Sequence, residues 1–125
     1  MKIKEIMNKA IAIDHEVSVR EAAKIMSNRN IGSLIVLRKN KIAGIITERD
    51  ILKNISSLGR KITSVMSKNV VTADQGDSVD NAALIMTERK VKRLPIISNG
   101  RLVGIITATD IVANSDLLNE DFFFD

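Results

Sequence analysis

Two short stretches of this 125-residue chain combine a hydroxyl and a carboxylate at a spacing suited to binding a sugar phosphate. Each reads Gly-Ile-Ile-Thr, two variable residues, then Asp-Ile, and they cover residues 44–51 and 104–111. Thr47 and Thr107 stand where an N-cap is expected, between an apolar strand and a helix. Asp50 and Asp110 follow three residues later, and an ionised carboxylate can accept bonds from two ribose hydroxyls. Because helix N-termini also attract phosphate, each corner predicts a ribose-phosphate site.

The same spacing has a purely structural interpretation. In a capping box, the residue three places after the N-cap returns a hydrogen bond to the N-cap backbone. Gly44 and Gly104 carry a separate signal, because a glycine in a strand allows another backbone to approach closely. The four-residue pattern alone favours capping, and it is the duplication of the pattern that favours a binding site.

An internal repeat determines the predicted architecture. At an offset of 60, residues 18–54 align with residues 78–114 without a gap, and 15 of the 37 pairs are identical. Upstream, Ile3 and Met7 match Ile62 and Met66 at an offset of 59. The chain is therefore expected to contain two copies of one structural unit.

Each copy predicts the order β-α-β-β-α. Ser18 and Ser78 stand at N-cap positions before the first helix of each copy. Asn99-Gly100 is a strong signal for a tight hairpin, whereas Lys39-Asn40-Lys41 predicts a looser turn. Strands are expected at 11–13, 34–37 and 42–46 in the first copy and at 70–72, 94–97 and 102–106 in the second.

The predicted fold class is α/β (α+β), with two tandem repeats packed as a pseudo-two-fold pair. A unit of about 60 residues buries little surface alone, so we expect the copies to pack together with their corners around shared clefts. The expected divisions are repeat 1 over 1–56, a linker over 57–61, repeat 2 over 62–114 and an acidic tail over 115–125.

Composition narrows the function classes. The net charge is +4, but the last ten residues hold four of the 15 acidic residues and no basic ones. The remainder has 19 basic against 11 acidic residues, a net +8 that suits anionic ligands from nucleotides to nucleic acid. With one histidine, His15, and no cysteine, the chain predicts neither a metal cluster nor an enzyme, and it has no P-loop.

Location and the tail give further expectations. No apolar run approaches a membrane span and no signal-peptide pattern opens the chain, so a cytoplasmic protein without membrane contact is predicted. The acidic tail ends with Phe122-Phe123-Phe124 between Asp121 and Asp125. It is interpreted either as a frayed terminus or as a docking peptide with aromatic anchors.

The pattern resembles the cystathionine-β-synthase (CBS) domain, which occurs in pairs called Bateman modules. The resemblance covers roughly residues 1–114 and rests on the two corners and on Ile6-Met7, Val65-Met66, Val70-Val71-Thr72 and Val91-Lys92-Arg93-Leu94-Pro95-Ile96. It implies a dimeric regulatory module that binds adenine nucleotides or related adenosyl ligands in clefts between the domains. Such a stand-alone module would regulate a separate effector protein and would need no cofactor.

The resemblance also implies residue roles. Asp50 and Asp110 would hold ribose hydroxyls, and Thr47 and Thr107 would contact phosphate or ribose. Five further residues would complete the site. Thr72 would lie beside the base, and Lys92 and Arg93 would contact phosphate. Leu94 and Pro95 would shape the slot for the base.

Structural interpretations remain open for part of this set. Lys92-Arg93 could be a solvated strand end, and Pro95 could mark an edge strand or a bulge. The first copy departs from the pattern, with Ala12 for Thr72, Gly32-Ser33 for the basic pair and Ile35 for Pro95, so the two clefts are expected to differ.

The function predicted from these observations is sensing of AMP, ADP, ATP or S-adenosylmethionine by a homodimer that modulates a separate partner. Two alternatives remain: a structural dimerisation domain without ligand, and a basic module that binds nucleic acid, which is less favoured.

Overall fold

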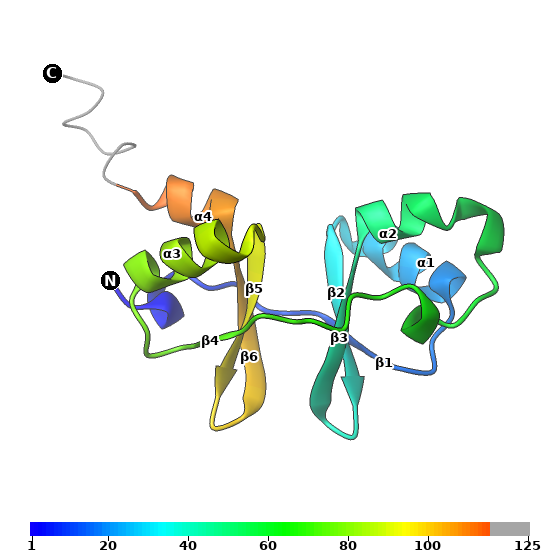
Figure 1. The fold of residues 1–125 in the computed structure, drawn as a ribbon, viewed down its shortest axis with the longest axis horizontal. Helices are drawn as coiled ribbons and strands as arrows, with labels where there is room; N and C mark the ends of the chain where they lie inside the picture. The colour runs from blue at the N-terminus through cyan, green and yellow to red at the C-terminus, as the bar shows by residue number, and fades with distance from the viewer. Residues whose placement is uncertain (116–125) are drawn as a thin grey trace, which may run out of the picture. The chain divides into compact units, whose positions relative to one another are not determined.

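The elements of the chain follow the expected β-α-β-β-α order twice. The computed structural model describes residues 1–115, and Figure 1 shows the two repeats of this order. These residues form two compact units, which are described separately. Unit 1 consists of Met1–Lys9 together with the chain from Val71 onward, and unit 2 consists of Ala10–Val70. The predicted fold class is thereby confirmed.

Unit 2 is a three-stranded sheet with helices on one side. Strand β2 (Ser33–Arg38) lies between the parallel β1 (Ala12–Asp14) and the antiparallel β3 (Lys41–Thr47). Helices α1 (Val19–Arg29) and α2 (Glu48–Lys53) lie on the same side of this sheet (Figure 1). Short 3-10 turns follow at Ile55–Ser57 and Ile62–Ser64. The core comprises Val19, Ala22, Met26, Leu34, Val36, Ile46 and Ile62.

Unit 1 has the same construction. Strand β5 (Arg93–Ser98) lies between the parallel β4 (Ala73–Asp74) and the antiparallel β6 (Arg101–Thr107). Helices α3 (Val79–Arg89) and α4 (Ala108–Ala113) cover one side, and a 3-10 turn at Ile3–Glu5 joins the core. The core comprises Ile3, Ala73, Ala82, Met86, Leu94, Ile96 and Ile106.

The compact units differ from the sequence repeats in the short segment that precedes the first strand of each copy, residues 1–9 and 62–70, which we call the lead. Ile3, from the first lead, is fully buried in unit 1, and Ile62, from the second lead, is fully buried in unit 2. The backbone of Asn8 exchanges two hydrogen bonds of 2.9 Å with Ile105 of β6. Ser67 exchanges bonds of 2.9 and 3.0 Å with Ile45 of β3. Each lead therefore packs on the other repeat, which the repeat alignment did not predict.

The glycine at the centre of each third strand makes this contact possible. A Cβ atom added to Gly104 would lie 2.8 Å from the Met7 Sδ atom and 2.9 Å from the carbonyl oxygen of Asn8. A Cβ atom added to Gly44 would lie 2.5 Å from the Met66 Sδ atom and 2.8 Å from the carbonyl oxygen of Ser67. The expected close approach of a second backbone at these glycines is confirmed.

The strand predicted at residues 70–72 was wrong, because β4 begins at Ala73. In unit 2, the Ile35 amide donates to the carbonyl oxygen of Ile11 at 3.0 Å and so extends the pairing of β1. Pro95 occupies the equivalent position in unit 1 and has no amide hydrogen, so β4 is shorter. Since β5 is the middle strand of its sheet, the edge-strand interpretation of Pro95 was also wrong.

The looser turn predicted at Lys39-Asn40-Lys41 was wrong as well. The loop contains only Lys39 and Asn40, with φ of 52° and 63°, and it matches the Asn99-Gly100 loop, with φ of 52° and 77°. Two-residue hairpin loops need positive φ at both positions to follow the twist of the strands. Strand twist therefore imposes this conformation on Lys39 although a lysine adopts it unfavourably.

The helix starts follow the predicted caps. The Ser18 hydroxyl accepts a bond of 3.1 Å from the Glu21 amide, and the Ser78 hydroxyl accepts one of 3.0 Å from the Asn81 amide. Each hydroxyl satisfies one of the amides that a helix start leaves without an intrahelical partner.

Candidate functional site

Both Thr-Asp corners form capping boxes. The Thr107 amide donates to the Asp110 Oδ2 atom at 2.8 Å, and the Asp110 amide donates to the Thr107 Oγ1 atom at 3.1 Å. The corresponding distances at Thr47 and Asp50 are 2.9 and 3.4 Å. The capping interpretation of the motif is therefore confirmed, and any binding role must coexist with it.

The capping box leaves part of each carboxylate free. Within residues 1–115, the hydrogen bonds to the side chains of Asp50 and Asp110 all use the Oδ2 atom. The Oδ1 atoms accept none, and both aspartates are half-buried. Asn54 and Asn114, the C-cap residues of α2 and α4, donate to the main-chain carbonyls of Asp50 and Asp110, both at 2.8 Å. Each corner thus has one carboxylate oxygen, Oδ1, that the capping box does not use.

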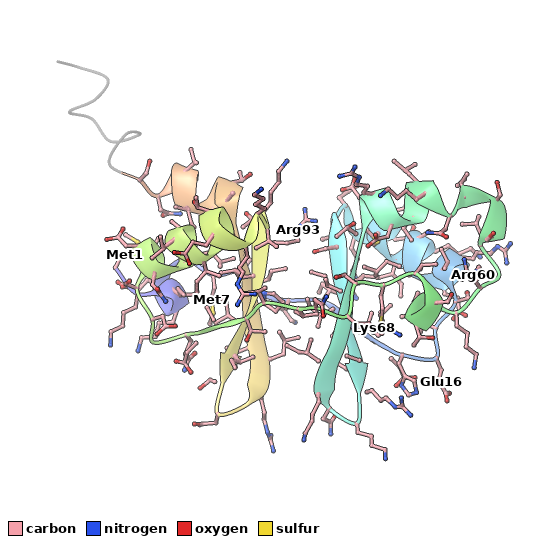
Figure 2. The ribbon with its side chains drawn as sticks, in the orientation of Figure 1. Met1, Met7, Glu16, Arg60, Lys68 and Arg93 are labelled. Atoms are coloured by element: carbon pink, nitrogen blue, oxygen red, sulfur yellow. The ribbon has the colours of Figure 1, made fainter. Side chains whose placement is uncertain are left out.

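In unit 1 the basic pair lies directly beside its corner. The carbonyl oxygen of Lys92 accepts a bond of 2.8 Å from the amide of Ala108, the first residue of α4. Arg93 is the cross-strand partner of Thr107. Lys92 is exposed and Arg93 is half-buried, and Arg93 is labelled at β5 in Figure 2. The backbones that carry both cationic side chains are thus paired with Thr107 and with the first residue of α4.

The remaining predicted residues of unit 1 belong to the same sheet. Ala73 pairs with Ile96, which places Thr72 one position before the pairing and next to Pro95. Pro95 and Leu94 are fully buried, and Leu94 belongs to the hydrophobic core. Seven predicted site residues thus belong to unit 1, namely Thr72, Lys92, Arg93, Leu94, Pro95, Thr107 and Asp110. The other two, Thr47 and Asp50, belong to unit 2.

The corner of unit 2 has the same backbone hydrogen bond and strand pairing as the corner of unit 1, but it has uncharged residues in place of the basic pair. The carbonyl oxygen of Gly32 accepts a bond of 3.1 Å from the Glu48 amide, and Ser33 is the cross-strand partner of Thr47. Gly32 and Ser33 therefore occupy the places of Lys92 and Arg93, as the alignment indicated. This corner has no cationic pair at the start of its middle strand.

A feature that the motifs did not indicate lies between the helices of unit 2. A cavity of about 480 Å³ is lined by side chains of α1 and α2 and by the loop after α1. Leu52 lines it and remains 70% exposed. The sequence signal for this cavity is the apolar Leu52 on the outer face of α2, which belongs to none of the motifs described above.

The described part of the chain has neither a cluster of metal ligands nor a helix that could span a membrane. Residues 1–115 contain no group of three or more histidine, cysteine, aspartate or glutamate side chains that could hold a metal ion. None of the helices in this range has the length and apolar character of a membrane span. The single histidine, His15, has a 26% exposed side chain with its Nδ1 atom 3.4 Å from the Asp14 Oδ1 atom.

Comparison with known proteins identifies the class that this fold and these corners define. The CBS domain family matches residues 3–57 and 62–116, which together make up most of the chain. The chain therefore belongs to the CBS domain family and contains a tandem pair of CBS domains.

Solved structures agree with this assignment. The CBS domain pair of protein MJ0100, in complex with 5′-methylthioadenosine and S-adenosyl-L-methionine, superimposes with a TM-score of 0.83. It is 34% identical in sequence, and the match covers 90% of this chain and 93% of that one. The CBS domain protein NE2398 superimposes with a TM-score of 0.84 at 25% identity, covering 91% of this chain and 96% of that one.

Curated relatives include both enzymes and small CBS proteins. Inosine-5′-monophosphate dehydrogenase of Thermoplasma acidophilum is 34% identical over 86% of this chain. L-aspartate semialdehyde sulfurtransferase of Methanocaldococcus jannaschii is 37% identical over 87% of it. This chain spans only 22% of the length of each enzyme. The CBS domain-containing protein YhcV of Bacillus subtilis is 29% identical over 90% of this chain, which spans 84% of YhcV.

Proposed function

We propose that this protein is a regulatory module that binds an adenosine-containing ligand and modulates a separate partner. The candidate ligands are AMP, ADP, ATP and S-adenosylmethionine. The observation that carries the proposal is the bond of 2.8 Å between the Ala108 amide and the Lys92 carbonyl, which holds the basic pair against the Thr107-Asp110 corner. The resemblance to a CBS pair bound to two adenosyl compounds supports the same ligand class.

Each polar residue has a defined role in this proposal. The free Oδ1 atom of Asp110 accepts a ribose hydroxyl, and Lys92 and Arg93 neutralise phosphate when the ligand has one. Thr72 lies beside the base, and buried Pro95 limits the slot. Asp50 and Thr47 offer a second corner without the cationic pair. In this proposal these residues bind and orient the ligand, so the role is regulatory.

A regulatory effect requires two states with different affinities for the ligand. A ligand shifts such an equilibrium only by its differential affinity for the two states. We place the equilibrium in a cytoplasmic homodimer whose contacts with an effector protein change on binding. Sedimentation of the full chain with and without ligand tests this part, since a constant monomer mass contradicts it.

Thermal denaturation with a ligand panel is the primary test. The panel contains AMP, ADP, ATP, NADH, S-adenosylmethionine and GMP, and it is followed by circular dichroism because the chain has no Trp or Tyr. A saturable rise of the melting temperature with adenosyl ligands alone is expected, because a ligand that binds the folded state stabilises it. If no adenosyl ligand shifts the transition, the proposal is wrong and a dimerisation domain becomes the better interpretation.

Matched variants separate binding from capping. Asp110→Asn keeps an oxygen for the Thr107 amide while removing the carboxylate charge, and Asp50→Asn makes the same change at the other corner. The ligand-induced shift should fall in at least one variant, although both remain folded without ligand. A short oligonucleotide, tested at low and high salt, checks the nucleic-acid alternative, because phosphate contacts weaken steeply with salt.

A further inference from the structure

The chain passes between the two units twice, and the first connection, residues 8–11, is held at both ends. Asn8 is tied to unit 1 by two backbone hydrogen bonds of 2.9 Å with Ile105. Ile11 is tied to unit 2, because its carbonyl oxygen accepts a bond of 3.0 Å from the Ile35 amide. Only two residues lie between these anchors, so the first connection is short and has little slack.

The second connection, residues 67–73, is held less firmly. Ser67 exchanges backbone bonds of 2.9 and 3.0 Å with Ile45 in unit 2, and Ala73 begins β4 in unit 1. Within residues 1–115, no backbone group of residues 68–72 forms a hydrogen bond. Five consecutive residues without backbone bonds therefore lie in the second connection, against two in the first.

A single residue difference explains why the second connection is not anchored like the first. Pro95 stands at the place of Ile35 in the repeat, and Val71 stands at the place of Ile11. A proline has no amide hydrogen, so Pro95 cannot give the Val71 carbonyl the bond that Ile35 gives in unit 2. The proline thus leaves the connection free on its unit 1 side.

The anchors of the first connection lead directly to the two Thr-Asp corners. Ile105 lies two residues before Thr107 in β6. Ile35 lies two residues after Ser33 in β2, and Ser33 is the cross-strand partner of Thr47. Covalent and hydrogen bonds therefore run without a break from one corner to the other. Contiguous bonded networks of this kind can carry energetic coupling between distant sites.

From this asymmetry we infer that the two corners are coupled through the first connection and not through the second. A displacement of β6 at the corner of unit 1 moves Asn8 and Ile11 together, because the two residues between them cannot absorb it. Residues 68–72 absorb the same displacement in the second connection. The corners are ligand sites only in the proposed function, on which this route of regulation rests.

Amide hydrogen exchange of the full chain, measured by NMR, tests the coupling without ligand. Thr107→Val removes the cap of α4 in unit 1, and the Ile35 amide reports the effect in unit 2. Ile31 is the reference, since its amide donates to the Met26 carbonyl of unit 2 at 3.1 Å and lies outside the connection. The Ile35 amide should exchange several-fold faster relative to the Ile31 amide in the variant. Global unfolding accelerates both amides alike, so their ratio isolates the local effect.

Two insertions identify the route. Two glycines between Lys9 and Ala10 lengthen the first connection, and two glycines between Asn69 and Val70 lengthen the second as the matched control. Each insertion is measured with and without Thr107→Val, and circular dichroism checks that the chains are folded. The first insertion should abolish the change in the exchange ratio, and the second should leave it intact. The predicted docking peptide in the acidic tail lies outside the described residues and stays unchanged in every variant.

The reverse perturbation needs no insertion and provides a second measurement. Thr47→Val should accelerate the Ile105 amide relative to the Val91 amide, which donates to the Met86 carbonyl at 3.0 Å in unit 1. An unchanged ratio in either direction, a change that survives the first insertion, or a change lost in both insertions would overturn the inference. Because no ligand is added, a failure of the ligand panel contradicts the proposed function alone.

Discussion

Met7, near the start of the chain, lies directly against Gly104 in the last strand of the second repeat. A Cβ atom at Gly104 would come within 2.8 Å of the Met7 Sδ atom, and Figure 2 shows Met7 beside the sheet of unit 1. The same relationship joins Met66 to Gly44 in unit 2. The packing of each lead on the sheet of the other repeat therefore depends on Gly44 and Gly104, which have no side chain.

Gly104→Ala should destabilise the protein by about 1–3 kcal/mol, because the added methyl overpacks against both a side chain and a backbone carbonyl. Urea denaturation followed by circular dichroism measures the change in the free energy of unfolding. Gly59→Ala is the matched control, since an added Cβ there meets no atom within 4 Å. Adding Met7→Ala to the Gly104→Ala variant should restore only part of the lost stability, because the Asn8 carbonyl oxygen would remain 2.9 Å from the new Cβ atom. Equal stability of the two alanine variants would contradict this account.

Thr107→Val should cost about 1 kcal/mol of unfolding free energy, because the valine cannot accept the bond of 3.1 Å from the Asp110 amide. Thr107→Ser retains the hydroxyl and should remain close to the wild type. The same pair at Thr47 should show a comparable loss, because the longer bond of 3.4 Å from the Asp50 amide is accompanied by a bond of 3.1 Å that the Thr47 hydroxyl donates to the Asp50 Oδ2 atom. Thermal and urea denaturation without ligand measure these differences, and a neutral Thr107→Val would show that the cap contributes nothing.

Ile35→Pro should destabilise unit 2 by about 1–3 kcal/mol, because it leaves the Ile11 carbonyl without its donor. The reverse change, Pro95→Ile, supplies an amide at the equivalent position of β5 and should be tolerated. Hydrogen exchange provides the specific measurement, since the new amide at position 95 should be protected if β4 lengthens. Rapid exchange at that amide would contradict our explanation of the short strand.

Replacing Lys39-Asn40 by Asn-Gly should stabilise the protein by about 1 kcal/mol, because asparagine and glycine adopt positive φ at lower cost than lysine. The change copies the loop of the second hairpin into the first. A higher urea midpoint with an unchanged slope is the expected result. Replacing Asn99-Gly100 by Lys-Asn should have the opposite sign, and two shifts of the same sign would contradict the explanation.

Local patterns predicted the fold where the interactions themselves are local. The caps at Ser18 and Thr107 involve residues three apart, so sequence spacing alone identifies them. The conformation of Lys39 was not predictable in this way, because the twist of the paired strands imposes it on a residue that disfavours it. Turn type therefore followed from tertiary structure and not from composition.

The exchange of leads could not be read from either repeat. Ile3 and Ile62 are the same residue type and have equivalent neighbours, so residue type alone would allow either lead to pack on either sheet. At the candidate site, the repeat alignment identified the Thr-Asp corners, and the resemblance to the family pointed to the basic pair. It did not show that Thr72 and Pro95 are neighbours, because that depends on the register of β4 against β5. Binding roles for these residues stay predictions.

The discontinuity of unit 1 has a consequence for synthesis on the ribosome. Residues 10–70 are contiguous, so the nascent chain can complete unit 2 before the rest of unit 1, from Val71 onward, has been translated. Ile3 and Met7 are translated before unit 2, yet they have no sheet to cover until Gly104 and Ile106 have been added. During that interval the start of the chain presents apolar side chains of the kind that chaperones bind and that promote aggregation. The segment that contains Ile3 and Met7 is thus made before unit 2 but buried only after it.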